Sequence, residues 1–218
     1  MSEGWQLPPS ASETGKSAVV RTGPSGLLLG TTGRGDLAVR LFRPQGTRLL
    51  LDVPDYAKWL LAFRAMCLGA HLSIISEDHR PWRTLADVVT AQGGTVDLLR
   101  TADKIPGAGR PYRPSLVIDD ASNFDGTQAS MGAWQAIAVV QSIKTGSAVH
   151  ALRNCDMALV AGVDSKGQEN LRRAYLLNPS QLRQTTNLGQ SNVVLAMPRR
   201  LVRVDFPPTP TEYRTLFG

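Results

Sequence analysis

The sequence contains little cysteine, which excludes a fold held together by several disulfides and a metal site built from cysteines. Its two thiols, Cys67 and Cys155, stand among 218 residues. Neither lies in a C-x-x-C motif or at a metal-ligand spacing, and one pair makes no disulfide framework. Cys67 falls within an expected helix and Cys155 just before an expected strand. We therefore expect two buried free thiols in a protein of a reducing compartment.

Long apolar runs are also absent, which argues against a membrane-spanning segment. The longest candidate, residues 59–75, is interrupted by Arg64 and His71 and is shorter than the ~18 apolar residues that a spanning helix needs. Residues 1–6 (MSEGWQ) show no basic stretch followed by an apolar one, so no signal peptide is expected. We expect a cytoplasmic protein that does not cross a membrane unaided.

Blocks of like charge are missing as well, although the chain is basic overall. The formal net charge is +6 and the isoelectric point is about 9.7. Such a balance is compatible with nucleic acid or an anionic membrane surface as a partner. However, the arginines are scattered and form no run of five or six. A solvated basic surface is therefore favoured, and nucleic acid is not an expected partner.

Strands and helices alternate through the first half of the chain. Residues 1–22 are polar, contain Pro8 and Pro9, and are expected to form a flexible arm, leaving 23–218 as a single α/β domain. Apolar strands are expected at 47–53, 71–76, 95–99 and 114–120, separated by helices at 55–68 and 81–92 and by a Pro/Gly/Arg loop at 105–114. Near-continuous apolar strands at this spacing indicate parallel pairing with right-handed crossovers.

The remaining elements extend this pattern and flank it with two hairpins. Runs 26–32 and 37–42 enclose the glycine-rich turn 33–36, whose R-G-D letters we interpret as turn chemistry. Further expected elements are strands at 134–141 and 157–160, helices at 148–154 and 168–177, a polar loop to 190, and a hairpin of 192–197 with 200–206. The fold class predicted is α/β, a Rossmann-like three-layer, mainly parallel sheet with flanking β-hairpins.

The first helix is expected to bury its large side chains on one face. Its candidate inward residues are Tyr56, Trp59, Leu60, Phe63, Met66 and Cys67. Gly69 is expected to end it in a left-handed conformation.

A phosphate-binding loop is missing from the place where this fold would carry it. A dinucleotide fold has G-x-G-x-x-G after its first strand, so that backbone amides approach the pyrophosphate. Here the segment reads D-V-P-D-Y-A, from Asp52 to Ala57. We expect Asp52, Pro54 and Asp55 to close the crevice, with no cofactor bound. Gly15-Lys16-Ser17 imitates the end of a P-loop, but Ser10 replaces its first glycine and no strand precedes it.

Other catalytic motifs are incomplete. Asp119 and Asp120 follow an apolar strand, as in a Walker B motif. If the chain were an enzyme, these two residues would be the candidates to act together with a metal ion. Without a P-loop, capping of the following turn is favoured. Asp125 completes no ligand spacing, and the three histidines lie far apart in the sequence. A G-x-S-x-G elbow is absent too. We expect neither a catalytic residue nor a metal site.

Apolar side chains near both ends are the candidate interaction residues. Trp5 lies in a segment too polar to build its own core, and whether it docks elsewhere stays open. The end of the chain reads T-P-T-E, a capping box with proline at the first helical position, from Thr209. The short helix that follows places Tyr213, Leu216 and Phe217 on one side. Packing against the domain's own core is favoured for this helix.

The order of several short motifs resembles that of the EccE family. These are L-F-R-P at 41–44 before T-R at 47–48, the step from Tyr56 to Gly69, and H-R-P-W at 79–82. Later matches are A-W-Q at 133–135, R-N-C-D at 153–156, P-T-P-T-E at 208–212 and the final L-F-G. The resemblance covers roughly residues 26–218. EccE proteins are membrane-complex components of type VII (ESX) secretion systems, and the resemblance implies such a role without established catalytic residues.

The resemblance therefore implies a non-enzymatic scaffold at the cytosolic side of a secretion membrane complex. Its partners would be protein subunits of that complex, with indirect or peripheral contact to the inner membrane. One departure concerns attachment, because EccE proteins usually begin with two transmembrane helices and this chain begins with a polar segment. Two alternatives stay open. One is a degenerate nucleotide- or sugar-nucleotide-dependent transferase using Asp119 and Asp120, and the other is a basic module that binds nucleic acid or anionic membranes.

Overall fold

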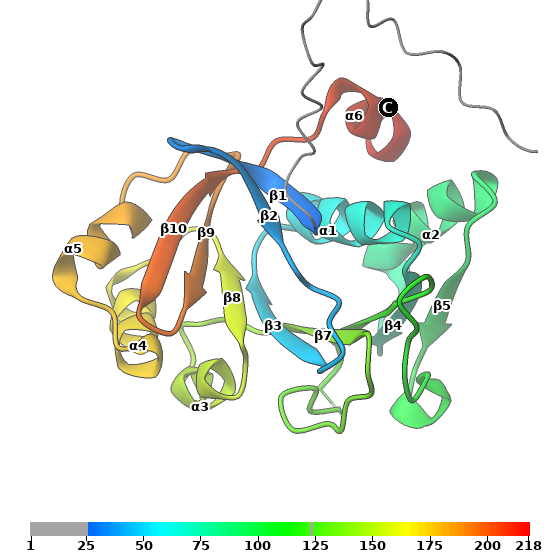
Figure 1. Ribbon diagram of the computed structural model, residues 1–218, viewed down its shortest axis with the longest axis horizontal. Coiled ribbons are helices and arrows are strands. Elements are labelled where there is room, and N and C mark those ends of the chain that lie inside the picture. The colour runs from blue at the N-terminus through cyan, green and yellow to red at the C-terminus, as the bar shows by residue number, and fades with distance from the viewer. Residues whose placement is uncertain (1–25, 123) are drawn as a thin grey trace, which may run out of the picture.

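The fold is a three-layer α/β arrangement around one continuous sheet (Figure 1). The computed structural model describes residues 26–122 and 124–218. The expected arm at 1–22, including Trp5, lies outside them. Ten strands run in the spatial order β2-β1-β10-β9-β8-β3-β7-β6-β4-β5. Their bounds are β1 Leu27–Thr32, β2 Gly35–Val39, β3 Thr47–Asp52, β4 His71–Ser76, β5 Val96–Leu99, β6 Ser115–Asp120, β7 Gln135–Val140, β8 Met157–Val160, β9 Asn192–Met197 and β10 Arg200–Asp205.

Six neighbouring strands, from β8 to β5, pair in parallel, and the remaining four pair antiparallel. The predicted mainly parallel sheet is thus confirmed over the predicted range 47–160. Both predicted hairpins join it: β9–β10 pairs with β8, and β1–β2 pairs with β10. The β1–β2 turn is tighter than expected, since Gly35 and Asp36 already belong to β2.

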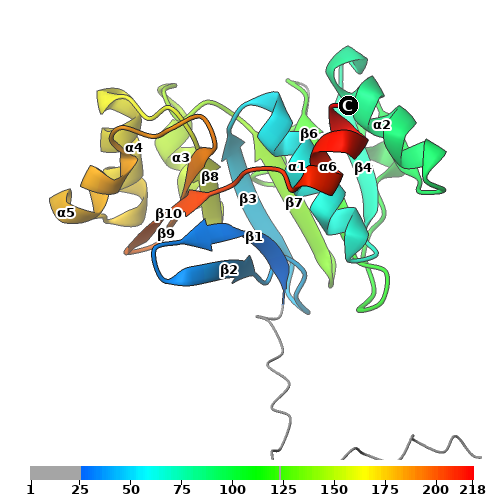
Figure 2. The ribbon, with the colours of Figure 1, turned by 90° about the horizontal axis from the view of Figure 1, so that it is seen from above.

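Helices cover both faces of the sheet (Figure 2). Their bounds are α1 Asp55–Cys67, α2 Arg80–Ala91, α3 Ala148–Arg153, α4 Ser165–Tyr175, α5 Pro179–Leu182 and α6 Pro210–Leu216, with 3-10 turns at Ala102–Lys104 and Arg183–Thr185. Successive side chains of β3 point to opposite faces of the sheet. Leu49 and Leu51 pack with α1, α2 and α6, whereas Leu50 packs with α3 and α4. None of the helices in the described part of the chain combines the length and apolar character that a bilayer crossing requires.

Helix α1 differs from its prediction in the face that it buries. The fully buried side chains are Ala57, Leu60, Leu61, Ala62 and Ala65, whereas the predicted Tyr56, Trp59, Phe63 and Met66 pack against the same core but are only partly buried. Small side chains let a helix lie close to strands that are themselves crowded with leucine. Of the predicted inward residues only Leu60 is fully buried, and Cys67 is exposed. The prediction of two buried thiols was therefore wrong for Cys67 and is confirmed for Cys155.

The segment from 178 to 190 is more ordered than the polar loop expected there. Asn178 caps α5 with its side chain, which accepts a hydrogen bond from the Gln181 backbone N–H at 2.9 Å. The Gln181 side chain in turn accepts from the Asn178 N–H at 2.9 Å, completing a capping box. Proline at the first helical position favours the same start. The sequence carries this capping signal, asparagine followed three residues later by glutamine, within a segment whose shortness and polarity are typical of a loop.

The C-terminal helix packs against the domain itself, as favoured from the sequence. The predicted capping box is confirmed: Thr209 Oγ accepts from the Glu212 N–H at 3.2 Å, and Glu212 accepts from the Thr209 N–H at 2.7 Å. Leu216 is 3% exposed, and the Phe217 ring stacks on that of Trp59 at 5.9 Å. α6 therefore lies against the outer side of α1, where it shields aromatic side chains from water.

Arg64 joins this C-terminal segment to α1 and β1. Its guanidinium donates two hydrogen bonds to the Glu212 carboxylate, at 2.7 and 2.8 Å, and both side chains are nearly buried. It also donates to the carbonyl oxygens of Leu29 and Pro207, each at 3.0 Å. The same guanidinium lies over the Phe206 ring, 4.9 Å from its centre. One side chain thus satisfies acceptors from three parts of the chain.

Replacing Arg64 with methionine should destabilise the domain strongly. Glu212 would be left as an unpaired charge in a nearly buried position, which costs ~3–5 kcal/mol of unfolding free energy. Denaturant titration of purified protein measures this loss. Arg80→Met is the matched control. The Arg80 side chain is 84% exposed, so its ion pair with Asp78 contributes little to the free energy of unfolding. Equal stabilities of the two variants would contradict the assigned role of Arg64.

Candidate functional site

The place where a parallel α/β sheet binds ligands is defined here by β3 and β7. These strands are neighbours, and the helices that follow them, α1 and α3, lie on opposite faces of the sheet. α1 leads across β7 and β6 to β4, whereas α3 leads back across β3 to β8. The strand order thus reverses between β3 and β7. A crevice for ligands is expected outside the carboxyl ends of strands at such a point.

Little chain is available at this point to form a phosphate cradle. β3 ends at Asp52 and α1 begins at Asp55, so only Val53 and Pro54 connect them. Pro54 is the N-cap of α1 and has no backbone N–H to offer an anion. Asp55 stands in the first turn and pairs with Lys58 at 2.6 Å. The amino end of α1 therefore presents a carboxylate where a nucleotide fold presents free amides.

Asp52 closes the crevice by binding the loop that follows β7. Its Oδ2 accepts a hydrogen bond from the Ile143 N–H at 2.8 Å and lies 3.4 Å from Ser142 Oγ. Asn170 of α4 donates to the Ile143 carbonyl at 2.7 Å, so this loop is held from both sides. The predicted position of Asp52 in this crevice agrees with these bonds, and the absence of a dinucleotide site stays a prediction. The prediction for Asp55 was wrong, because its side chain is 62% exposed and turned to Lys58.

Asp119, near the end of β6, is buried next to the backbone of Gly126. It is 2% exposed and accepts hydrogen bonds from the Gly126 N–H at 2.8 Å and the Ala121 N–H at 3.4 Å. Burial raises the pKa of this carboxyl from an ordinary 3.8 to about 6, against the lowering effect of these two donors. Gly126 permits the approach, since a Cβ there would lie 2.8 Å from Asp119 Oδ2. The favoured interpretation, capping of the turn after the strand, agrees with these contacts.

Asp120 points to the opposite face of β6 from Asp119. Its Oδ2 accepts a hydrogen bond from Trp82 Nε1 of α2 at 2.7 Å. The two carboxylates of the alternative enzyme reading are therefore directed to different layers and are each engaged by the fold. Within residues 26–122 and 124–218, no cluster of three His, Cys, Asp or Glu side chains could hold a metal ion. The geometry does not assemble the two-aspartate site that the transferase alternative needs.

The candidate interaction residues of the C-terminal helix differ in their exposure. Tyr213 is 57% exposed, Leu216 is buried, and Phe217 is partly covered by Trp59 and Tyr213. Tyr213 alone of the three offers a largely free ring. A docking role for these residues stays a prediction, as does that of Trp5, which lies outside the described residues.

Comparison with known proteins identifies the fold. No family model and no curated protein sequence matches this chain. Among solved structures, VirB4 of Thermoanaerobacter pseudethanolicus is similar with a TM-score of 0.56 and 9% identity, over 89% of this chain and 100% of that one. The genome packaging NTPase B204 from Sulfolobus turreted icosahedral virus 2, in complex with AMPPCP, has a TM-score of 0.49 and 12% identity, over 76% of this chain and 100% of that one.

A further similar structure is the pCW3 conjugation coupling protein TcpA in monomer form with ATPgS. Its TM-score is 0.47 and its identity 11%, over 82% of this chain and 64% of that one. At these identities the likeness extends to the fold alone. The ten-stranded, mainly parallel sheet with helices on both faces matches Rossmann-like folds of the P-loop NTPase type.

Replacing Asp119 with asparagine should change how stability depends on pH. In the wild type the native state takes up this proton near pH 6 and the unfolded state near 3.8, so stability falls as pH rises between these values. Asparagine removes that dependence while keeping an acceptor for the Gly126 N–H. The unfolding free energy of Asp119→Asn relative to wild type should therefore rise from pH 4 to 7, by up to ~3 kcal/mol. A difference that stays constant over this range in denaturant titrations would contradict the burial of a charged Asp119.

Proposed function

We propose that this chain is a non-catalytic assembly domain, built on a P-loop NTPase-type fold, that docks at the cytosolic side of a type VII secretion membrane complex. The proposal rests on one observation above all: the Asp52 carboxylate occupies the crevice between β3 and β7 and is bonded to the Ile143 N–H at 2.8 Å. The subunit role follows the resemblance of the sequence to the EccE family.

The length of the β3–α1 connection supports the non-catalytic part of the proposal. A P-loop, G-x-x-x-x-G-K-[ST], wraps the phosphates with successive backbone amides and brings a lysine to them. Two residues cannot wrap a phosphate, and Lys58, the first lysine of α1, is already paired with Asp55. Asp52 would moreover repel a triphosphate at close range. Binding of ATP at this point would require the connection to be rebuilt.

The commitment of the strand-end carboxylates supports the same conclusion. Hydrolysis needs a carboxylate near the phosphates to position a metal ion or water. Asp119 is instead buried and bonded to the Gly126 N–H, and Asp120 is bonded to Trp82 on the other face. Neither side chain is available in the crevice between β3 and β7. A domain of this kind contributes to function through its surface.

Nucleotide binding is the second candidate function, and the fold itself favours it. The sheet is similar to that of VirB4 over 89% of this chain, and this type of fold carries nucleotides at the carboxyl ends of its strands. In this reading the chain would bind a nucleotide without the usual loop, or would complete a site on a neighbouring subunit. The two candidates differ in whether the isolated chain has any nucleotide affinity.

Titration calorimetry with ATP, ADP, NAD and a UDP-sugar in the presence of Mg²⁺ separates these candidates. We expect no saturable binding at the crevice between β3 and β7, which means a Kd weaker than about 1 mM there for every ligand. Asp55→Gly should be equally inactive, since Asp52 and the short connection remain. A micromolar Kd that Arg113→Gln, at the opposite ends of the strands, leaves unchanged would overturn the non-catalytic proposal and favour the nucleotide-binding candidate.

The docking part of the proposal predicts a selective effect of Tyr213. Its exposed ring lies on α6, and aromatic anchors dominate many protein interfaces. Tyr213→Ala should reduce co-purification of the chain with type VII membrane-complex subunits from the native host in mild detergent, without lowering the thermal midpoint. Leu176→Ala is the control, because Leu176 is 67% exposed at the end of α4, on another side of the molecule (Figure 1).

Equal recovery of complex subunits with Tyr213→Ala and wild type would exclude α6 as the docking surface. Absence of these subunits from the wild-type preparation would count against the assignment to a type VII complex.

A further inference from the structure

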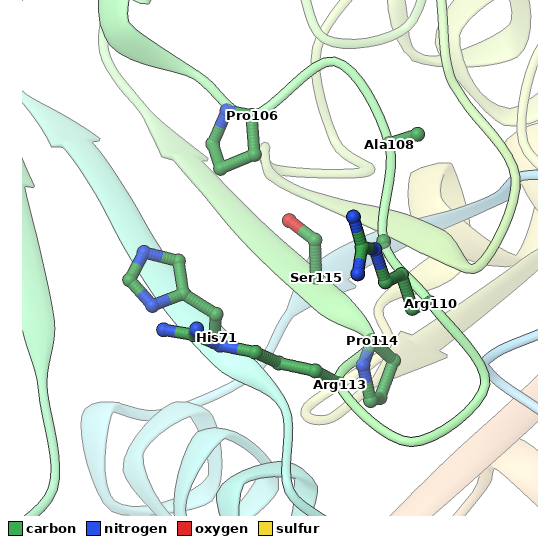
Figure 3. A pocket seen from close by; sticks show the side chains of 8 residues that line it. His71, Pro106, Ala108, Arg110, Arg113, Pro114 and Ser115 are labelled. Atoms are coloured by element: carbon green, nitrogen blue, oxygen red, sulfur yellow. The ribbon is translucent and has the colours of Figure 1, made fainter.

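A second concave site lies at the opposite ends of the strands, where β4 and β6 begin (Figure 3). Its cavity has a volume of about 240 Å³. The first residues of the two strands, His71 and Ser115, form its floor, and they are direct neighbours in the parallel pairing. The loop 105–114 covers it and contributes Pro106, Arg110 and Arg113. This site shares no residue with the crevice closed by Asp52.

Two polar atoms at this site are buried without a partner in the described part of the chain. Ser115 is 2% exposed, and its hydroxyl makes no hydrogen bond. Figure 3 shows this hydroxyl directed into the space between His71, Pro106 and Arg110. His71 Nδ1 is likewise unpartnered, whereas its Nε2 lies 2.8 Å from Asp97 Oδ2. Buried polar groups are normally satisfied, so two orphans beside one cavity indicate a missing partner.

The charge around the cavity indicates which partner is missing. Arg110 and Arg113 both line it, and none of its lining residues is a carboxylate. The carboxylate of Asp97 lies beside His71 and is engaged with its other ring nitrogen, Nε2. Guanidinium groups and hydroxyls are donors that suit the oxygen atoms of an anion. We propose that this cavity binds an oxyanion, the phosphate or carboxylate group of a small molecule.

The loop that supplies the arginines is held in shape before any ligand arrives. The backbones of Arg110 and Arg113 exchange two hydrogen bonds, at 2.9 and 3.0 Å, which close a tight turn between them. The Gly109 N–H donates to the Ala133 carbonyl at 2.8 Å and fastens the loop to the rest of the domain. Arg110 is further supported by Tyr112, whose hydroxyl accepts from it at 2.9 Å. A preformed site loses less entropy on binding.

The dimensions of the site limit the ligand to a small anion or to an anionic end group. Pockets for whole drug-sized ligands usually measure ~300–1,000 Å³, which is more than this cavity offers. His71 and Arg113 also line a neighbouring groove of about 520 Å³, whose other walls include Phe63, Met66 and Val89. An organic remainder attached to the anion would lie in this largely apolar groove. A phosphate monoester with an aromatic group is therefore a suitable probe.

The test is titration calorimetry of the full chain with inorganic phosphate, phenyl phosphate and acetate in about 150 mM sodium chloride. We expect saturable binding with a stoichiometry of one for at least one of them. Phosphate against acetate distinguishes the two kinds of oxyanion, and phenyl phosphate against phosphate reports whether the groove contributes. Arg113→Gln and Arg110→Gln should each weaken binding about tenfold or more, the expected loss for a charged hydrogen bond.

Two further variants make the result specific. Ser115→Ala should weaken binding about tenfold while leaving the thermal midpoint without anion unchanged or higher, because it removes an orphaned hydroxyl. Arg34→Gln, in the exposed β1–β2 turn, removes the same charge far from the cavity and should leave Kd within about twofold of wild type. The proposal is overturned if none of the three anions binds saturably, if Arg113→Gln and Ser115→Ala bind as tightly as wild type, or if Arg34→Gln weakens binding equally.

Discussion

The functional interpretation depends on the two-residue connection between β3 and α1 and on the hydrogen bond that Asp52 accepts from the Ile143 N–H. In a parallel α/β sheet the reversal of strand order opens a crevice, and a nucleotide-binding protein fills it with a glycine-rich loop and a phosphate. This chain fills it with its own carboxylate, bonded to the Ile143 N–H. The same contact holds the loop after β7 against β3.

A second polar contact, between Arg64 and Glu212, joins distant segments of the chain on the outer side of α1. The C-terminal helix has seven residues, too few to be stable in isolation. Its capping box, the burial of Leu216 and the Arg64 pair together attach it to the domain. Asp52 and Arg64 thus have similar roles, because each is a charged, partly buried side chain that joins segments distant in the sequence. Both contacts serve assembly of the fold.

The two edges of the sheet therefore differ in what they offer a ligand. At the carboxyl edge Asp52, Asp119 and Asp120 all have partners within the fold. At the amino edge Ser115 and His71 retain orphaned polar atoms beside two arginines. Negative side chains gather where this type of fold ordinarily binds phosphate, and positive ones gather at the other end. The two proposals, an oxyanion site at one end of the strands and no nucleotide site at the other, both follow from how charge is distributed along this sheet.

The sequence by itself determined the strands, most helices, the parallel core and both hairpins, because apolar periodicity, capping boxes and the turn at Gly69 are local signals. It also determined that the phosphate loop is missing, since glycine must be present in the segment that needs it. Only the tertiary structure decided that Ala57 and Ala65 face the core while Cys67 does not, that Asp55 turns outward, and that Asp52 meets Ile143. The cavity between His71, Arg113 and Ser115 was equally invisible beforehand. These contacts join residues that strand order and crossovers bring together, and a local pattern of side chains does not encode that order.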